Sequence, residues 1–333
     1  MTQQREPLVD RFGRTHTYLR VSVTERCNLR CNYCMPPEGI PLLDRSDVLT
    51  FEEITRIVRI LAEMGINKVR LTGGEPLVRR ELDKLVRLIV NIPGIRAVCM
   101  TTNGVLLSGC ADLLRRSGVS LVNISLDSLR PDRFLRITHR DNHEDVLRGI
   151  DAALRASFDS LKLNVVVMGG VNDDELLDFI EFAADCPINV RFIEFMPFES
   201  NGWNRGSLVP AAEMRRRIEE RYELIPLFPN SNREAVASEY RIPGIKGTIG
   251  FIASMTEEFC GGCNRLRLMA DGGLKTCLFN PPEGNLRDAM RSGADDEELE
   301  YLVRSCLELK AERHEPMESL VFFSRIPMIA IGG

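Results

Sequence analysis

The sequence predicts an α/β fold, and three observations support this prediction. Short β-rich runs alternate with amphipathic helical stretches from residue 17 to about residue 196, an order that is typical of a parallel sheet. The strand runs themselves alternate between apolar and polar positions. The chain has 333 residues, of which 44% are hydrophobic and 27% are charged, so it can bury a sizeable core without disulfide staples.

The alternating part of the chain contains six strand candidates. They are Thr17–Thr24, Lys68–Thr72, Ala97–Thr102, Leu121–Leu126, Leu161–Met168 and Val190–Met196. Between the first two, Thr50 and Glu53 form a capping box at the start of a helix that Gly65 ends. Similar helical patterns follow at Leu82–Ile89 and Leu176–Phe182.

The predicted strands keep one polar face. Leu19 and Val21 alternate with Arg20 in the first strand, and Arg70 and Lys162 lie on the polar sides of the second and fifth. A parallel strand covered by helices on both faces should be apolar on both. We therefore expect an incomplete (β/α)6 barrel of the TIM type, with helices outside and a wet, ligand-filled lumen inside. The alternative is a set of edge strands with one solvated face.

Polar segments follow the C-terminal ends of several predicted strands. Gly73–Pro76 follows the second, Thr101–Gly104 ends the third, and Ser125–Asp127 ends the fourth. In barrels of this kind the active site lies at these strand ends. We therefore expect the functional residues to gather there.

The pattern changes after about residue 200. A charged helix is expected at Ala211–Tyr222, and charged helices are expected within Leu286–Leu309. Between them lie short β-like runs at Gly247–Ser254, Leu266–Met269 and Leu274–Leu278. The sequence thus predicts an N-terminal arm (1–16), the partial barrel (17–225) and a C-terminal α+β capping domain (226–333) that ends in two glycines.

Composition and charge exclude several classes of protein. The first ten residues are polar and charged, unlike a signal peptide, and no run approaches the roughly 18 apolar residues of a membrane span. We therefore expect a cytoplasmic protein that does not bind a membrane. The net charge of −5 makes general binding of nucleic acid by charge an unfavourable interpretation.

Ten cysteines are unusual in a reducing compartment, where disulfides are rare. Six of them form two triplets, Cys27-x3-Cys31-x2-Cys34 and Cys260-x2-Cys263-x13-Cys277. Neither triplet has an obvious fourth local ligand, which a structural zinc site requires. Three thiolates on a four-iron cluster leave one iron open for a further ligand. We therefore favour iron–sulfur clusters over zinc at both triplets, and interpret the other four cysteines as small buried hydrophobes.

The first triplet, with Tyr33 between its last two cysteines and Gly73-Gly74-Glu75-Pro76 after the second strand, resembles the radical S-adenosylmethionine (SAM) enzymes. The second triplet, with Arg265 and Arg267 just after Cys263, and the terminal glycines resemble the molybdenum cofactor biosynthesis protein A family, the GTP 3′,8-cyclases. This resemblance runs from about residue 11 to residue 333.

The resemblance implies two [4Fe-4S] clusters, SAM as a cofactor and GTP as the substrate. In the family, a 5′-deoxyadenosyl radical removes the 3′ hydrogen of GTP, and cyclisation yields 3′,8-cyclo-7,8-dihydro-GTP in the first step of molybdenum cofactor biosynthesis. Cyclic pyranopterin monophosphate synthase would act next. The resemblance also implies an electron donor of the flavodoxin or ferredoxin type, and the family suggests a homodimer.

The resemblance assigns roles to individual residues. The cluster ligands would be Cys27, Cys31 and Cys34 for the first cluster, and Cys260, Cys263 and Cys277 for the second. SAM contacts are expected at Tyr33, Gly74, Ser125 and Met196. GTP contacts are expected at Arg20, Arg70, Thr101, Lys162, Arg191, Arg265, Leu266 and Arg267. Catalytic roles are expected for Arg20 and for the tail residues Gly332 and Gly333.

Two other functions fit the cysteine pattern. One is a radical SAM peptide maturase in which the C-terminal cluster relays electrons, although the paired arginines near residue 266 favour a nucleotide. The other is a zinc-stabilised binding or regulatory protein without chemistry of its own. The iron and zinc content of the purified protein would distinguish this zinc-stabilised protein from a cyclase.

Overall fold

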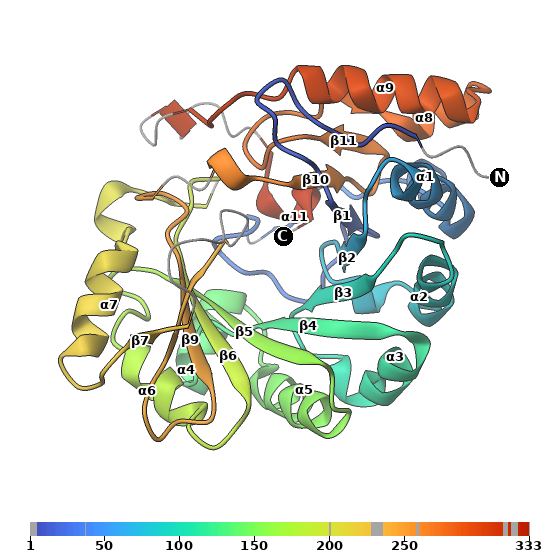
Figure 1. Ribbon diagram of the computed structural model, residues 1–333. Coiled ribbons are helices and arrows are strands. Elements are labelled where there is room, and N and C mark those ends of the chain that lie inside the picture. The colour runs from blue at the N-terminus through green and yellow to red at the C-terminus, as the bar shows by residue number, and fades with distance from the viewer. Residues whose placement is uncertain are drawn as a thin grey trace.

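The computed structural model describes residues 5–36, 38–199, 201–227, 236–257, 260–315, 319–320 and 326–332. Within these residues, twelve strands form one sheet (Figure 1). The strands are β1 (Tyr18–Ser22), β2 (Lys68–Thr72), β3 (Ala97–Thr102), β4 (Val119–Ser125), β5 (Ser160–Val167), β6 (Ile188–Glu194), β7 (Ile225–Pro226), β8 (Ser238–Arg241), β9 (Thr248–Ile252), β10 (Arg265–Leu268), β11 (Gly273–Lys275) and β12 (Gly284–Asn285).

The six strands predicted between residues 17 and 196 are confirmed as β1 to β6, with ends that differ by no more than two residues. Each is parallel to the next in chain order. Two later strands add to this run in parallel: β10 pairs with β1, and β9 pairs with β6. The remaining strands extend both ends with antiparallel pairs, giving the order β12-β11-β10-β1-β2-β3-β4-β5-β6-β9-β8-β7.

Strands after residue 226 therefore continue the first sheet at both of its ends rather than forming a sheet of their own. Local sequence patterns predicted β9 and β10 as short strands but not their partners, because pairing across 59 or more residues leaves no local signal. The two ends of the sheet, β12 and β7, are not paired with each other. In Figure 1 the sheet curves from β10 through β3 and β4 to β9.

Helices cover the outer face of the curved sheet (Figure 1). They are α1 (Phe51–Glu63), α2 (Leu82–Val90), α3 (Ala111–Ser117), α4 (Pro131–Thr138), α5 (His143–Arg155), α6 (Leu176–Phe182), α7 (Ala211–Glu219), α8 (Leu286–Arg291) and α9 (Asp296–Glu308), whereas α11 (Met328–Ile331) lies inside the curve. The predicted capping box of α1 is confirmed, since the Thr50 hydroxyl accepts from the Glu53 amide at 3.2 Å and the Glu53 carboxylate accepts from the Thr50 amide at 2.8 Å. In the described part of the chain, no helix has the length and apolar character to cross a membrane.

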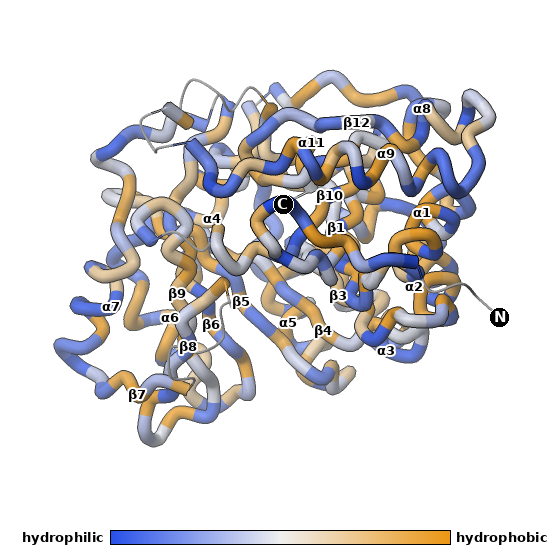
Figure 2. Tube along the Cα trace, turned by 45° about the horizontal axis from the view of Figure 1, so that its top comes forward, coloured by the Kyte–Doolittle hydropathy of each residue, from blue (hydrophilic) through white to orange (hydrophobic). Residues whose placement is uncertain are grey.

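The strand faces follow the predicted alternation. Leu19 and Val21 are fully buried in the main core beneath α1, whereas Arg20 between them faces the inside of the curve. Orange, apolar stretches run along β6 and β9 in Figure 2, between blue surface loops. The alternative of solvated edge strands is wrong for β1, which has β10 on one side and β2 on the other.

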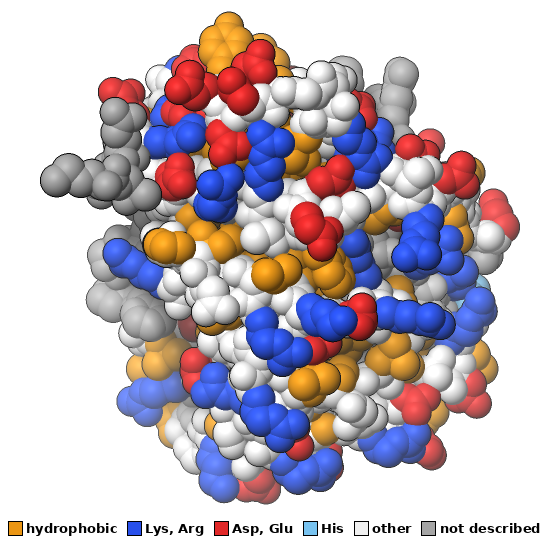
Figure 3. All heavy atoms as spheres, turned by 90° about the vertical axis from the view of Figure 1, so that its right-hand side faces the viewer, with side chains coloured by type: hydrophobic (Ala, Val, Ile, Leu, Met, Phe, Trp, Pro, Cys, Tyr) orange, Lys and Arg blue, Asp and Glu red, His pale blue; other side chains and the backbone are white. Residues whose placement is uncertain are grey.

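The N-terminal and C-terminal parts of the chain are also tied together on the outside. Arg56 of α1 pairs with Asp296 at the start of α9 at 2.8 Å, and Arg291 of α8 pairs with Glu53 at 2.7 Å. On the side of the molecule shown in Figure 3, basic and acidic side chains are intermixed. The helix α11 lies in the middle of the curve of the sheet, beside β1 and β10 (Figure 1).

Candidate active site

A cavity of about 580 Å³ opens inside the curve of the sheet. Its lining comes from the C-terminal ends and inner faces of β1 to β6, from the first cysteine loop, from β10 and from the tail. It includes fourteen of the residues predicted from the sequence: Arg20, Cys27, Cys31, Tyr33, Cys34, Arg70, Gly74, Thr101, Ser125, Lys162, Arg191, Met196, Arg265 and Arg267. Residues that lie up to about 250 positions apart in the chain thus face one space.

The first cysteine triplet lies in the loop that follows β1. Cys27, Cys31 and Cys34 are free thiols that line the cavity together. The Leu29 amide donates to the Cys27 sulfur at 3.4 Å and the Asn103 side-chain amide approaches it at 3.7 Å. Such N–H···S contacts stabilise cluster thiolates, and soft thiolate donors select iron–sulfur clusters or zinc. Burial raises the pKa of Cys27 to about 11, so a bound cluster would displace its proton.

The glycine pair after β2 packs directly against this cysteine loop. A Cβ atom on Gly73 would lie 2.5 Å from the Thr24 carbonyl oxygen, and one on Gly74 would lie 2.3 Å from the Arg26 carbonyl oxygen. The Gly74 amide also donates to the Thr24 carbonyl at 2.6 Å. The close approach that requires glycine is therefore to the backbone of residues 24–26, whereas the sequence suggested an approach to a ligand.

Two buried carboxyl groups lie beside the first triplet, and sequence reasoning did not single them out. Glu75 accepts from the Thr102 hydroxyl at 2.7 Å and from the Asn103 amide at 2.6 Å, and burial raises its pKa to about 7. Asp127 accepts from the Tyr33 hydroxyl at 2.8 Å, and burial raises its pKa to about 6. Both residues stand in the polar segments that follow β2 and β4, which was the available signal.

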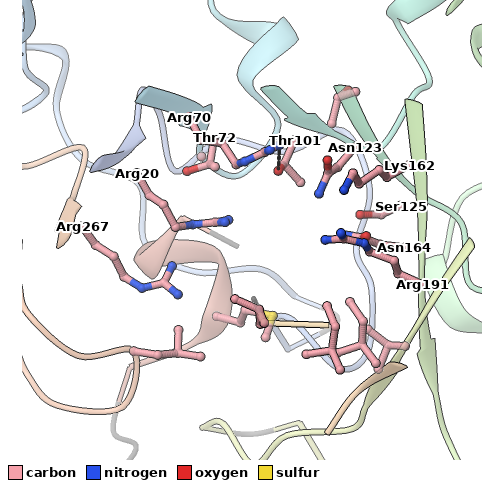
Figure 4. A pocket seen from close by; sticks show the side chains of 18 of the residues that line it. Arg20, Arg70, Thr72, Thr101, Asn123, Ser125, Lys162, Asn164, Arg191 and Arg267 are labelled. Atoms are coloured by element: carbon pink, nitrogen blue, oxygen red, sulfur yellow. Dashed lines mark hydrogen bonds between the residues drawn. The ribbon is translucent and has the colours of Figure 1, made fainter. Parts of the chain in front are cut away.

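The rest of the cavity is strongly basic. Seven basic side chains line it, against the two carboxyl groups: Arg20, Lys68, Arg70, Lys162, Arg191, Arg265 and Arg267. Figure 4 shows Arg20 and Arg267 entering from one side and Lys162 and Arg191 from the other. Lys68 was not predicted as a site residue, although it stands two positions before Arg70 on the same face of β2. This arrangement suits an anion with several charges.

Several polar atoms in this basic region are buried and have no hydrogen-bond partner in the part of the chain that the structure describes. They are Arg267 Nη1, Asn123 Oδ1 and Asn164 Oδ1. Buried polar atoms in folded proteins are nearly always paired. Because all three residues line the cavity, a polar ligand with both acceptors and donors would satisfy them.

Neighbouring residues hold the basic side chains in place. Arg70 donates to the Met100 carbonyl at 2.7 Å and lies 3.3 Å from the Thr101 hydroxyl, the contact dashed in Figure 4. Glu239 of β8, which the sequence did not indicate, forms a salt bridge with Arg191 and lies 3.5 Å from the Lys162 ammonium. Burial and the neighbouring Arg191 lower the pKa of Lys162 to about 8, although Glu239 opposes them.

The second cysteine triplet lies beside the basic end of the cavity without lining it. Cys260 begins a short turn, in which the Cys263 amide donates to the Cys260 carbonyl at 3.1 Å, and Cys277 follows β11. Burial opposes ionisation of Cys263, but Arg265 and Lys310 outweigh it and lower its pKa to about 7. No three His, Cys, Asp or Glu side chains among the described residues are placed to hold a single metal ion.

Leu266 differs from its neighbours. Its side chain is fully buried in the main core, on the opposite face of β10 from Arg265 and Arg267. Side chains alternate between the two faces of a strand, so the Leu266 side chain points away from the cavity. The predicted contact of Leu266 with GTP would therefore involve its backbone rather than its side chain.

The C-terminal tail reaches the same region. The Gly332 carbonyl accepts from the Arg20 guanidinium at 3.3 Å, and Ile329 and Ile331 are buried. Gly332 has a φ of 85°, and a Cβ atom there would lie 2.7 Å from the Thr72 hydroxyl. Gly332, expected from the resemblance to have a catalytic role, thus lies beside Arg20 at the cavity, while Gly333 lies outside the described residues.

Comparisons with known proteins identify the family of the chain. The model of the radical SAM superfamily matches residues 21–183, and the model described as Molybdenum Cofactor Synthesis C matches residues 188–316. The mitochondrial GTP 3′,8-cyclase of Arabidopsis thaliana is 46% identical over 98% of this chain and 83% of its own length. The GTP 3′,8-cyclase of Syntrophomonas wolfei is 42% identical over 98% of this chain and 100% of its own length.

Other relatives are longer or more distant. Molybdenum cofactor biosynthesis protein 1 of Mus musculus is 44% identical over 98% of this chain, which spans about half (51%) of that protein. The crystal structure of Streptococcus suis SuiB bound to S-adenosylmethionine superposes with a TM-score of 0.58 at 14% identity, over 87% of this chain and 68% of the other. That likeness shows the radical SAM fold alone. Identity over nearly the whole chain, together with both domain matches, shows that this chain belongs to the radical SAM superfamily and, within it, to the GTP 3′,8-cyclase family.

Proposed function

We propose that this chain is a radical SAM GTP 3′,8-cyclase that converts GTP into (8S)-3′,8-cyclo-7,8-dihydroguanosine 5′-triphosphate, the first step of molybdenum cofactor biosynthesis. The observation that carries the proposal is the single cavity, which has a cysteine triplet at one end and seven basic side chains around the rest. A radical enzyme must bring its cofactor and its substrate into one enclosed space, and this cavity offers both kinds of lining.

The first end of the cavity would hold a [4Fe-4S] cluster and SAM. Cys27, Cys31 and Cys34 would ligate three irons, and the open iron would leave room for SAM. The predicted SAM contacts Tyr33, Gly74, Ser125 and Met196 all line this cavity. Bound here, the cluster and SAM supply a 5′-deoxyadenosyl radical. The chain itself would orient the cofactor, with Tyr33 fixed by its hydrogen bond to Asp127.

The basic end would bind GTP. Arg20, Arg70, Lys162, Arg191, Arg265 and Arg267 would neutralise the triphosphate, and Thr101 would add a hydroxyl contact. Charge-assisted hydrogen bonds from several arginines bind phosphates strongly and with defined orientation. The Asn123 and Asn164 oxygens, which have no partner among the described residues, line the same cavity next to Lys162 and Arg191 in the sheet, where the nucleoside could satisfy them. Arg20 and the tail around Gly332 would complete the site and exclude water.

A second [4Fe-4S] cluster on Cys260, Cys263 and Cys277 belongs to this proposal. Its support is the group of three cysteine thiols beside Arg265 and Arg267. Its open iron would lie next to the guanine of a GTP whose phosphates contact those arginines. In this proposal the curved sheet is an incomplete (β/α)6 barrel, and the C-terminal domain begins at residue 226. The chain would receive electrons from a donor of the flavodoxin or ferredoxin type. Its product would pass to cyclic pyranopterin monophosphate synthase. The chain would form a homodimer.

The test uses protein purified and reconstituted anaerobically and then reduced with dithionite in the presence of SAM and GTP. We expect about eight irons per chain, with formation of 5′-deoxyadenosine and a cyclised nucleotide that both depend on GTP. Cys31→Ala should abolish SAM cleavage, while Cys277→Ala should retain some uncoupled cleavage without cyclised product. The proposal would be overturned if 5′-deoxyadenosine formed at the same rate with and without GTP. It would also be overturned if the protein contained stoichiometric zinc in place of iron. A peptide substrate fits the basic cavity poorly, because two carboxyl groups face seven cations.

A further inference from the structure

Lys310 has an unusual position at the second cysteine triplet. It follows α9 directly, and its side chain turns inward so that the residue is only 3% exposed. The ammonium lies 3.7 Å from the sulfur of Cys263 and donates to the carbonyl of Thr276, the residue before Cys277. Lys310 therefore bridges the segments that carry two of the three thiols.

The Lys310 ammonium forms no ion pair with an acidic side chain that the structure describes. No carboxylate lies within ion-pair distance of its ammonium in the part of the chain that the structure describes, and its contacts are a sulfur and a carbonyl oxygen. An ammonium ion buried without a counter-ion costs several kcal/mol. Among the described residues, the group that contacts this ammonium and can take a negative charge is the Cys263 thiol.

The surroundings strengthen this requirement. One titratable neighbour outside the triplet is His16, which is fully buried and hydrogen-bonded to Asp10 at 3.1 Å. Burial and the charge of Lys310 lower the pKa of His16 to about 4, so His16 stays neutral. Arg14 pairs with Asp10 at 2.6 Å and donates to the Cys260 carbonyl at 2.9 Å. The charge of Asp10 is thus already neutralised by Arg14, and Asp10 does not act as the counter-ion of Lys310.

We propose that Lys310 is the buried counter-cation of the second iron–sulfur cluster and a positioning residue for its thiolate ligands. The inference rests on the second cluster of the proposed function. A cluster held by three thiolates carries net negative charge, which compensates the ammonium, and the Thr276 contact fixes the ammonium between two ligands. A nearby positive charge also stabilises the electron that the cluster accepts on reduction.

The test compares Lys310→Met, which removes the charge at similar length, with Lys310→Arg, which keeps it. Both are made in a full-length background with Cys27, Cys31 and Cys34 replaced by Ala, so that only the second cluster remains. Lys84→Met, which removes an exposed lysine on α2, controls for the loss of one charge. Iron content and redox titration with dithionite, followed by electron paramagnetic resonance, give readouts independent of turnover.

We expect Lys310→Met to shift the midpoint potential of the second cluster to a more negative value, while Lys310→Arg and Lys84→Met stay near the parent value. If Lys310→Met loses its cluster, retention of the four irons in Lys310→Arg supports the proposal. Equal potentials and iron contents in Lys310→Met and the parent overturn it, as does the same loss in Lys310→Arg. A parent background that binds no iron at all would instead overturn the second cluster itself, so the two failures are distinguishable.

Discussion

Substituting Gly74 by alanine tests how the site is assembled, because Gly74 packs on the loop that carries the first cysteine triplet. The added Cβ atom would meet the Arg26 carbonyl oxygen at 2.3 Å and the Glu25 carbonyl oxygen at 2.7 Å. Both are backbone atoms, which cannot rotate away as the end of a flexible side chain can. The loop that begins the triplet must therefore move.

The size of the movement follows from the contact distances. Ordinary van der Waals contact begins at 3.4 Å, so the Arg26 carbonyl must retreat by about 1 Å, one residue before the cluster ligand Cys27. Overpacking of this kind costs about 1–3 kcal/mol of stability. A misplacement of about 1 Å in a catalytic constellation can lower the rate roughly 100-fold. We therefore expect Gly74→Ala to fold but to cleave SAM at most at about one hundredth of the normal rate.

The assay measures 5′-deoxyadenosine after reconstitution, together with iron content and thermal unfolding. Gly261→Ala is the matched control, because a Cβ atom at Gly261, between Cys260 and Cys263, meets no atom of the described residues within 4 Å. We expect that variant to behave like the parent. SAM cleavage by Gly74→Ala within a factor of about three of the parent rate would refute the reasoning, since the cysteine loop would then tolerate the displacement.

Three further predictions concern the basic end of the cavity. Burial and Arg191 lower the pKa of Lys162 to about 8, so its side chain is cationic below that pH and neutral above it. The KM for GTP should therefore rise as the pH increases through about 8. The Lys162→Arg variant should not show that rise. Glu239→Gln frees Lys162 and Arg191 from a competing carboxylate, so KM for GTP should fall several-fold at low salt; an unchanged KM would contradict the competition. Gly332→Ala places a Cβ atom 2.7 Å from the Thr72 hydroxyl at a φ of 85°, and should lower cyclised product relative to 5′-deoxyadenosine, as product analysis by chromatography would show.

The strands and their polar face could be predicted because both depend on local patterns. Arg20 and Arg70 alternate with buried neighbours every second residue, which is the repeat of a strand, so their direction into the curve followed from the sequence. Glu239 and Lys310 gave no such signal. Glu239 acquires its role from a contact with Lys162 at 3.5 Å, 77 positions away in the chain. Lys310 acquires its role from a contact with Cys263 at 3.7 Å, 47 positions away.

The sequence by itself determined the α/β class, the six parallel strands, the two thiol triplets and the cations of the inner face, because periodicity and motif spacing are local properties. Only the tertiary structure decided that β9 and β10 extend the same sheet at its two ends, and that Gly74 packs on the cysteine loop. It also decided that Leu266 faces the core and that Lys310 lies buried at the second triplet. These features depend on which distant segments pair and pack, and that is set by the burial of the whole chain rather than by any short stretch of it.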